Sequence, residues 1–286
     1  MTIIEAQREI AKILREGGVE NAMNEARFFL QDALGYNSVQ LVTGYRDYAC
    51  QSCVETAFAW ARRRAKGEPM QYILGCTDFM GLEIRVEPGV LIPRPETEGL
   101  CELLMEDGRR PSAILDLCTG SGCIAAWAAK TFPDAKITAT DLSKDALSVA
   151  EENFCRHESF PGQVTLLQGD LFEALDAVAG DCPRFDVILS NPPYIPSSTV
   201  DELESEVKDY EPRLALDGGP AGMDLVSRII EDAPDYLPPG GLLLMEIDDT
   251  QEELVREACA SSGRYASFAV LRDLAGKVRY LKANKE

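Results

Sequence analysis

The first 75 residues carry apolar side chains at the three- and four-residue spacing of amphipathic helices. The segments IIEAQREIAKILREGG, NEARFFLQDALG and CVETAFAWARRRAKG show this spacing, and each ends at a glycine, a common helix terminator. No strand-like alternation of apolar and polar residues separates them. Residues 1–75 are therefore predicted to fold as a small helical bundle.

The pattern changes in the next segment, EPMQYILGCTDFMGLEIRVEPGVLIPRPETE. The runs YILG and LEIRV have the composition of strands and are separated by glycine, which predicts a β-hairpin-like linker at residues 76–95. Pro95 suits the first position of a helix, and Glu96 and Glu98 would then lie beside the positive end of the helix dipole. A second domain, residues 96–286, is predicted to begin there.

From residue 96 onward, short apolar runs alternate with segments of helical spacing. The runs are SAILDL, KITATD, VTLLQGD, FDVILS and GLLLMEI, followed by a final pair around residues 267–282. Short apolar strands that alternate with helices are typical of an open, mostly parallel α/β sheet. The carboxyl ends of such strands form one edge, where ligands bind.

The chain is strongly acidic, with 28 Lys+Arg against 48 Asp+Glu and a formal net charge of −20. Such a charge repels phosphate backbones and anionic membranes, so no direct nucleic-acid or membrane partner is expected. The run DELESEVKDYE at residues 201–211 concentrates this charge. Two interpretations of it stay open, a solvated helix and a docking face for a basic partner.

Nine scattered cysteines, one C-x-x-C pair (Cys50 and Cys53) and a single histidine, His157, do not form a set of metal ligands. We expect reduced thiols, no metal, and an exposed loop position for His157 rather than a catalytic one. The start MTIIEAQREI lacks the apolar core of a signal peptide, and no apolar run approaches the ~20 residues that span a bilayer. A cytoplasmic protein is therefore expected.

The first strand of the α/β region runs into DLCTGSGCIA, residues 116–125. Gly120 and Gly122 would allow a tight turn and a close approach of the backbone to a ligand at the start of a helix. Cys118 and Ala125 separate the segment from the G-x-G-x-x-G motif of dinucleotide-binding folds. A simple strand-to-helix turn remains the alternative for the glycines alone.

Two acids strengthen the ligand interpretation, because each follows a strand at the same edge. Asp141 is placed to bind ribose hydroxyls, and Asp170 to accept the adenine amino group, with Leu171 over the ring. A nucleoside without phosphates but with positive charge, such as S-adenosylmethionine, suits these carboxylates. The predicted cofactor contacts are Asp116, Leu117, Cys118, Thr119, Gly120, Gly122, Asp141, Leu142, Asp170, Leu171 and Asn191, with Arg94 and Glu96 framing the pocket or merely preceding a helix.

The fourth strand, FDVILS, leads into NPPYIP at the same edge. Consecutive prolines cannot continue a strand ladder, so the turn is stiff. An NPPY quartet behind a glycine-rich loop resembles amino-methyltransferases that use S-adenosylmethionine. Together with EPMQYILG, VLIPRPETE, YEPRLALDGG, GMDL and LAGKVRY, it resembles the release-factor glutamine methyltransferases, the HemK or PrmC family.

This resemblance implies a Rossmann-like seven-stranded methyltransferase sheet, mostly parallel with an antiparallel last strand, behind an N-terminal helical substrate-recognition domain. It implies methylation of the glutamine side-chain amide in the Gly-Gly-Gln motif of peptide-chain release factors, in translation termination. A monomer is expected. Cys118 departs from the glycine of many relatives. Alternatives are methylation of a ribosomal-protein glutamine or a nucleic-acid amine, and a catalytically silent scaffold that binds the cofactor.

The predicted catalytic residues are Asn191, Pro192, Pro193 and Tyr194. If Asn191 Oδ1 and the Pro192 carbonyl each accept one amide N–H, the nitrogen is fixed with one face toward the methyl donor. The prolines would fix the direction of that carbonyl, and Tyr194 would stack on the planar amide. No strong base is needed, because the methylated, still-protonated amide loses its proton readily. In YEPRLALDGG, Glu211 and Arg213 are expected to form a buried pair that shapes this loop.

Overall fold

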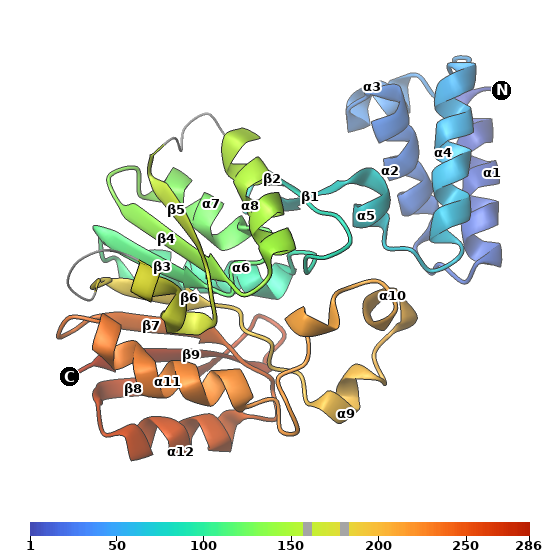
Figure 1. Ribbon diagram of the computed structural model, residues 1–286. Coiled ribbons are helices and arrows are strands. Elements are labelled where there is room, and N and C mark those ends of the chain that lie inside the picture. Colours follow the sequence, from blue (N-terminus) through green and yellow to red (C-terminus); the bar gives the residue numbers. More distant parts are fainter. Residues whose placement is uncertain (157–161, 178–182) are drawn as a thin grey trace. The chain divides into compact units, whose positions relative to one another are not determined.

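The computed structural model describes residues 1–156, 162–177 and 183–286 (Figure 1). It divides into two compact units, Met1–Cys76 with Glu204–Tyr210, and Thr77–Leu203 with Glu211–Glu286. The chain therefore passes from one unit to the other after residues 76, 203 and 210. His157, which was predicted to be an exposed loop residue, lies outside the described residues.

The first unit is a helical bundle, as the apolar spacing predicted. Its helices are α1 (Ile3–Glu16), α2 (Ala22–Leu34), α3 (Ser38–Thr43), α4 (Gln51–Arg64), α5 (Met70–Leu74) and α10 (Ser205–Lys208). A capping box starts α1, because Glu5 N donates to Thr2 Oγ1 at 3.4 Å and Thr2 N donates to Glu5 Oε2 at 2.9 Å. Ile10, Phe29 and Leu41 are fully buried in the core of this bundle.

The run YILG was predicted to be a strand, and this was wrong. Met70–Leu74 forms the short helix α5, which ends at Gly75 with a φ of 80°. Ile73 joins the core of the bundle. Periodicity cannot distinguish a strand from a helix in so short an apolar run, and here packing against the bundle decides the outcome.

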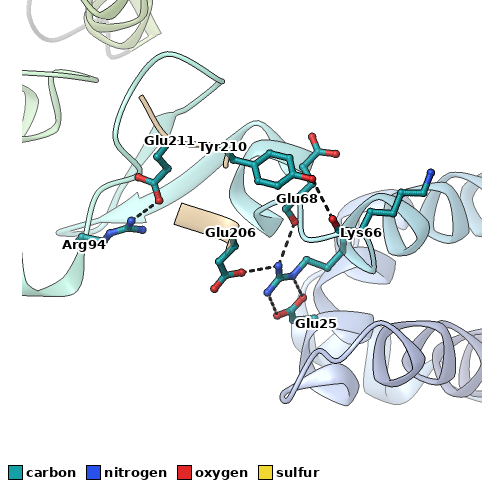
Figure 2. Close-up of polar contacts among 8 residues, drawn as sticks. Glu25, Lys66, Glu68, Arg94, Glu206, Tyr210 and Glu211 are labelled. Carbon is teal, nitrogen blue, oxygen red and sulfur yellow. Dashed lines mark hydrogen bonds and ion pairs between the residues drawn. The ribbon is translucent and has the colours of Figure 1, made fainter. Parts of the chain in front are cut away.

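The acidic run after NPPY contributes α10 to the first unit. Figure 2 shows Glu25 and Glu206 at one guanidinium, that of Arg64, with Nε 2.8 Å from Glu25 Oε2 and Nη1 2.6 Å from Glu206 Oε2. The Tyr210 hydroxyl also donates to the Lys66 carbonyl at 3.3 Å. Part of the acidic run thus neutralises a half-buried arginine of the helical unit.

The second unit contains a seven-stranded sheet in the order β5-β4-β3-β6-β7-β9-β8. Pairing is parallel from β5 to β7, and β9 runs antiparallel to both β7 and β8. The predicted Rossmann-like sheet with an antiparallel last strand is confirmed. Its strands are β3 (Ala113–Leu117), β4 (Lys136–Asp141), β5 (Val164–Gln168), β6 (Val187–Ser190), β7 (Leu242–Glu246), β8 (Tyr265–Arg272) and β9 (Val278–Lys285).

Helices cover both faces of this sheet (Figure 1). The pair α7 and α8 packs on one face and the pair α11 and α12 on the other. The strand order explains this, because the chain proceeds from β3 toward one edge of the sheet and from β6 toward the other, and both crossovers are right-handed. The helices of the unit are α6 (Pro95–Asp107), α7 (Cys123–Thr131), α8 (Lys144–Arg156), α9 (Ser197–Val200), α11 (Asp224–Tyr236) and α12 (Glu252–Ser262), with 3₁₀ turns η1 (Leu171–Ala177) and η2 (Arg213–Ala215).

A separate two-stranded sheet, β1 (Cys76–Phe79) and β2 (Leu82–Arg85), stands at the predicted linker. The boundary between the units falls inside β1, so nearly all of this hairpin belongs to the second unit. Within the described ranges, no helix is long and apolar enough to cross a bilayer.

Candidate active site

An open cavity of the second unit lies at the carboxyl ends of β3, β4 and β6, where the strand order reverses. Its empty volume, including the part that is open to solvent, is about 1000 Å³. Among the predicted residues, its lining includes Cys118, Thr119, Gly120, Asp141, Leu142, Asp170, Leu171, Asn191 and Pro193. The loops that follow β3, β4, β5 and β6 thus line one cavity. Predicted cofactor residues and two of the predicted catalytic residues, Asn191 and Pro193, meet there.

Asp116, the last but one residue of β3, is completely buried and does not line this cavity. Its Oδ2 accepts hydrogen bonds from Thr119 Oγ1 at 2.6 Å and from Ala125 N at 3.1 Å, which orders the loop between β3 and α7. Its Oδ1 has no partner among the described residues. Burial raises the pKa of Asp116 to about 7, against the two hydrogen bonds that lower it.

The loop after β3 turns through three residues with positive φ, Cys118 at 59°, Gly120 at 55° and Gly122 at 79°. A Cβ at position 122 would lie 2.9 Å from the Phe154 ring and 3.0 Å from Ala150 Cβ, so α8 packs directly against this glycine. Cys118 occupies a left-handed conformation that favours glycine. The predicted tight turn is therefore present, and the close approach of its backbone to a ligand stays a prediction.

Asp141 ends β4 and holds the glycine-rich loop from the other side. Its Oδ2 accepts from Gly120 N at 2.9 Å, and its Oδ1 accepts from Ser143 N at 2.8 Å. Burial raises the pKa of this carboxyl, while the backbone N–H groups of Ser143 and Gly120 lower it. The carboxylate lies in the cavity wall beside Leu142, whose side chain is exposed.

Asp170 also lines the cavity, but both its oxygens already have a partner. Arg228 of α11 donates to Oδ1 at 3.2 Å and to Oδ2 at 2.9 Å. The next residue, Leu171, has a φ of 49° and is almost fully buried. Sequence reasoning missed Arg228, because a charged residue in an amphipathic helix carries no signal of its partner.

The cavity suits a nucleoside that carries positive charge. Carboxylates of Asp141 and Asp170 lie in its wall. Asp116 does not line the cavity, but its buried Oδ1 has no partner among the described residues. The backbone of the glycine loop can approach a ligand because no side chain stands above Gly120. These residues fit S-adenosylmethionine, whose sulfonium and ammonium groups are cationic.

The NPPY turn presents a chain of hydrogen bonds at the same cavity. Asn191 Nδ2 donates to Thr97 Oγ1 at 2.9 Å, and Thr97 Oγ1 donates to Glu246 Oε2 at 2.8 Å. The Tyr194 hydroxyl donates to Glu246 Oε1 at 2.7 Å. No described residue donates to Asn191 Oδ1 or to the Pro192 carbonyl. Both atoms, which were predicted to accept from an incoming amide, are therefore without a donor among the described residues.

Glu246 ends β7 and is 1% exposed. Burial raises its pKa, while hydrogen bonds from Tyr194 and Thr97 lower it, as does the charge of Arg279. The pKa of Tyr194 lies well above its usual range because of burial and the adjacent Glu246. Sequence reasoning missed Thr97 and Glu246. Glu246 could have been found, because it stands near the end of the apolar run GLLLMEI, as Asp141 stands at the end of KITATD.

Other contacts hold the NPPY turn rigidly. Gln251 Nε2 donates to the Tyr194 carbonyl at 2.8 Å, and Ile195 exchanges backbone hydrogen bonds with Leu216 and Gly218. A Cβ at Gly218 would lie 2.6 Å from the Pro193 carbonyl, so only glycine allows this approach. The segment YEPRLALDGG thus shapes the turn through its backbone.

The predicted pair of Glu211 and Arg213 does not form. Glu211 is buried, accepts from Ile92 N at 3.2 Å and pairs with Arg94 (Figure 2). Arg213 lies at the surface and pairs with Asp201 at 2.7 Å and with Asp217 at 3.0 Å. Arg213 begins a 3₁₀ turn directly after Pro212, whereas Glu211 is buried before it.

Several predicted residues lie near the cavity without lining it. Glu96 is exposed in the first turn of α6, and Arg94 precedes that turn. Tyr194 has its hydroxyl turned inward to Glu246. The predicted contacts that are absent from the cavity wall are Asp116, Leu117, Gly122, Arg94, Glu96, Pro192 and Tyr194, and their roles stay predictions.

Comparisons with known proteins bear on the whole chain. A family profile described as PrmC N-terminal domain matches residues 5–75, and one described as Methyltransferase small domain matches residues 95–206. A release factor glutamine methyltransferase from Geobacter sulfurreducens is 43% identical over 242 residues, 85% of this chain and 82% of that protein. Its namesake from Moorella thermoacetica is 38% identical over 281 residues, 98% of this chain and 97% of that protein.

Solved structures share the fold at low sequence identity. The hMettl16 catalytic domain, in complex with the MAT2A 3'UTR hairpin 6, has a TM-score of 0.57 at 16% identity and covers 79% of this chain and 81% of that chain. A methyltransferase from Pyrococcus furiosus has a TM-score of 0.50 at 21% identity, and the match covers 72% of this chain and 90% of that chain. These likenesses concern the methyltransferase fold alone.

Proposed function

Because the chain belongs to the release factor glutamine methyltransferase family, we propose that it methylates the side-chain amide nitrogen of a glutamine in peptide-chain release factors. The Gly-Gly-Gln motif of these factors is the proposed target. The observation that carries the chemistry is the pair of unoccupied acceptors, Asn191 Oδ1 and the Pro192 carbonyl, beside the carboxylate-lined cavity.

S-adenosylmethionine is the proposed cofactor, and it supplies a methyl group on a cationic sulfonium when bound. Asp141 would hold its ribose hydroxyls, Leu171 would cover the adenine, and the backbone at Gly120 would face the amino-acid end. Asp170 would accept from the adenine amino group with an oxygen that it shares with Arg228, because Arg228 already donates to both of its oxygens. The Asp116 carboxyl would order the loop from below.

The chain's own residues would position the nucleophile. An amide nitrogen has two N–H hydrogens, and the two acceptors match them, so the nitrogen would be held with one face toward the methyl donor. Positioning of this kind is worth up to about 7–11 kcal/mol in favourable cases. A glutamate or an alkyl side chain would leave the buried acceptors unpaired or repelled, at a cost of about 1–3 kcal/mol for each group.

The helical unit is proposed to recognise the protein substrate, and the enzyme to act in the cytoplasm as a monomer. The net charge of −20 supports a protein rather than a nucleic-acid substrate, since it disfavours a phosphate backbone.

The test is transfer of labelled methyl from S-adenosylmethionine to purified release factor, to ribosomal subunits and to DNA. Label should enter the release factor, and replacing the glutamine of its Gly-Gly-Gln motif should prevent incorporation. Label in ribosomal protein or DNA, with none in the release factor, would overturn the proposed substrate.

A further inference from the structure

We propose that Thr97 and Glu246 are positioning residues that determine which atom of the Asn191 amide faces the substrate. This inference rests on the proposed function and deepens it. The two residues sit on different elements, α6 and β7, and converge behind the NPPY turn through the hydrogen-bond chain from Asn191 to Glu246.

The direction of this chain follows from the number of hydrogens available. A threonine hydroxyl has a single hydrogen, and Thr97 donates it to Glu246 Oε2 at 2.8 Å. Thr97 Oγ1 can then only accept from Asn191, which it does at 2.9 Å from Nδ2. The NH₂ end of the Asn191 amide is therefore directed to Thr97, and Oδ1 is left for the substrate.

Glu246 sets this direction because an ionised carboxylate can only accept hydrogen bonds. Its second oxygen, Oε1, accepts from the Tyr194 hydroxyl at 2.7 Å, so both carboxylate oxygens are occupied by donors. The carboxylate is buried, and the positive charge of Arg279 on β9 lies close to both Glu246 and Tyr194. No described donor competes with Thr97 for Oε2.

A neutral amide at position 246 would remove this constraint. Its NH₂ group could donate to Thr97 Oγ1, and Thr97 would then be able to donate to Asn191 instead of accepting from it. Asn191 could rotate its amide by half a turn and present Nδ2 to the cavity. A donor there repels the N–H groups of glutamine and suits the oxygens of glutamate, so selectivity for an amide nitrogen would fall.

The experiment measures kcat, KM and selectivity on purified release factor for wild type, Glu246→Gln, Thr97→Val and Thr97→Ser. Thr97→Val keeps the shape but removes the hydroxyl, whereas Thr97→Ser retains it. We expect Thr97→Val and Glu246→Gln to lower kcat by about 10- to 100-fold, with the Kd of S-adenosylmethionine changed less than about threefold. Thr97→Ser should stay within about threefold of wild type.

Binding gives a readout that loss of packing alone would not change. The Kd is compared for unmodified release factor and for a factor with glutamate in place of the target glutamine. Wild type should prefer glutamine, and this preference should shrink by at least about tenfold in Glu246→Gln. Asp186→Asn is the control, because Asp186 caps the opposite end of β6 through Ser112 N at 2.7 Å and should affect stability alone.

Thr97→Val with wild-type kcat, or Glu246→Gln with an unchanged preference for glutamine, would overturn the proposal. Equal losses in Thr97→Ser and Thr97→Val would also do so, because they would assign the effect to packing. Failure of the proposed function has a different signature, since wild type itself would then transfer no methyl to release factor.

Discussion

At the scale of single residues, the proposed function depends on which polar atoms of the site are already hydrogen-bonded within the protein. Asn191 has an amide that can present either end, and Thr97 takes the NH₂ end. Asp116 has one oxygen bonded to the loop and one left without a described partner. In both cases one end of the side chain is hydrogen-bonded and the other has no partner among the described residues.

Replacement of Asn191 by alanine should remove one of the two acceptors for the amide nitrogen. We expect kcat to fall by about 10²–10³-fold, because an oriented group that acts on the reacting centre is lost. The Kd of S-adenosylmethionine, measured by calorimetry, should change less than about threefold. Near-normal turnover in the variant would contradict the role given to Asn191.

Asp116 should make the unfolding free energy depend on pH. Burial raises its pKa from 3.8 to about 7, so the folded protein holds a proton that the unfolded chain releases. Stability from this group is therefore greatest below about pH 4 and decreases as the pH rises toward about 7, by at most about 1.4 kcal/mol per pH unit. Above about pH 7 the contribution of Asp116 to the unfolding free energy no longer changes with pH.

Asp116→Asn should abolish this slope, because the side chain no longer titrates. Urea unfolding at about pH 5 and about pH 8 compares the two proteins. Wild type should lose stability relative to the variant between these values. Parallel changes in both proteins would show that Asp116 does not carry the proton.

At the scale of elements, the loop between β3 and α7 contains two glycines in different surroundings. Gly122 is the N-cap of α7 and packs against Phe154 and Ala150 of α8. Gly120 has open space where a Cβ would stand and lines the cavity. One glycine serves helix packing and the other leaves room for a ligand.

Gly122→Ala and Gly120→Ala should therefore fail in different ways. Gly122→Ala combines a positive φ with a contact at 2.9 Å and should lower the unfolding free energy by about 2–4 kcal/mol. Gly120→Ala meets no atom within 4 Å, so it should lose only about 1–2 kcal/mol but raise the Kd of S-adenosylmethionine. Thermal unfolding and cofactor titration of both variants distinguish these effects, and the opposite order would refute the assignment.

At the scale of the whole molecule, the helical unit contains a segment from the distant acidic run. Residues 204–210 follow the NPPY turn in the chain but fold with residues 1–76. Arg64 joins this segment to α2 through Glu206 and Glu25, and its side chain is only 13% exposed. Both ends of the segment continue into the methyltransferase unit, so the units are joined covalently at three places.

Arg64→Met should release this segment, because it leaves Glu25 and Glu206 without their shared cation. We expect a loss of about 2–4 kcal/mol in the stability of the helical unit and faster hydrogen exchange at residues 204–210. Cofactor affinity should be unchanged. Arg213→Met is the matched control, since Arg213 is 54% exposed and its solvent-screened pairs with Asp201 and Asp217 should contribute little to stability. Unchanged exchange at 204–210 in Arg64→Met would contradict the role of Arg64.

Sequence patterns predicted most of the architecture because periodicity over long segments reports burial directly. Strands such as AILDL and LLLME are apolar because parallel strands are covered on both faces. The short run YILG lay below the length at which periodicity discriminates, and it proved to be helical. The pairing of Glu211 with Arg94, rather than with Arg213, depended on where separate loops meet.

The sequence by itself determined the α/β sheet, the helical unit, the family and the edge at which Asn191, Asp141 and the glycine loop gather. Each of these follows from local spacing or from motifs that a chain carries in one dimension. Only the tertiary structure decided that Thr97 and Glu246 stand behind Asn191 and that Glu206 belongs with Arg64. These contacts join residues that are distant in the chain, and their partners are chosen by packing and desolvation, which act only once the chain has folded.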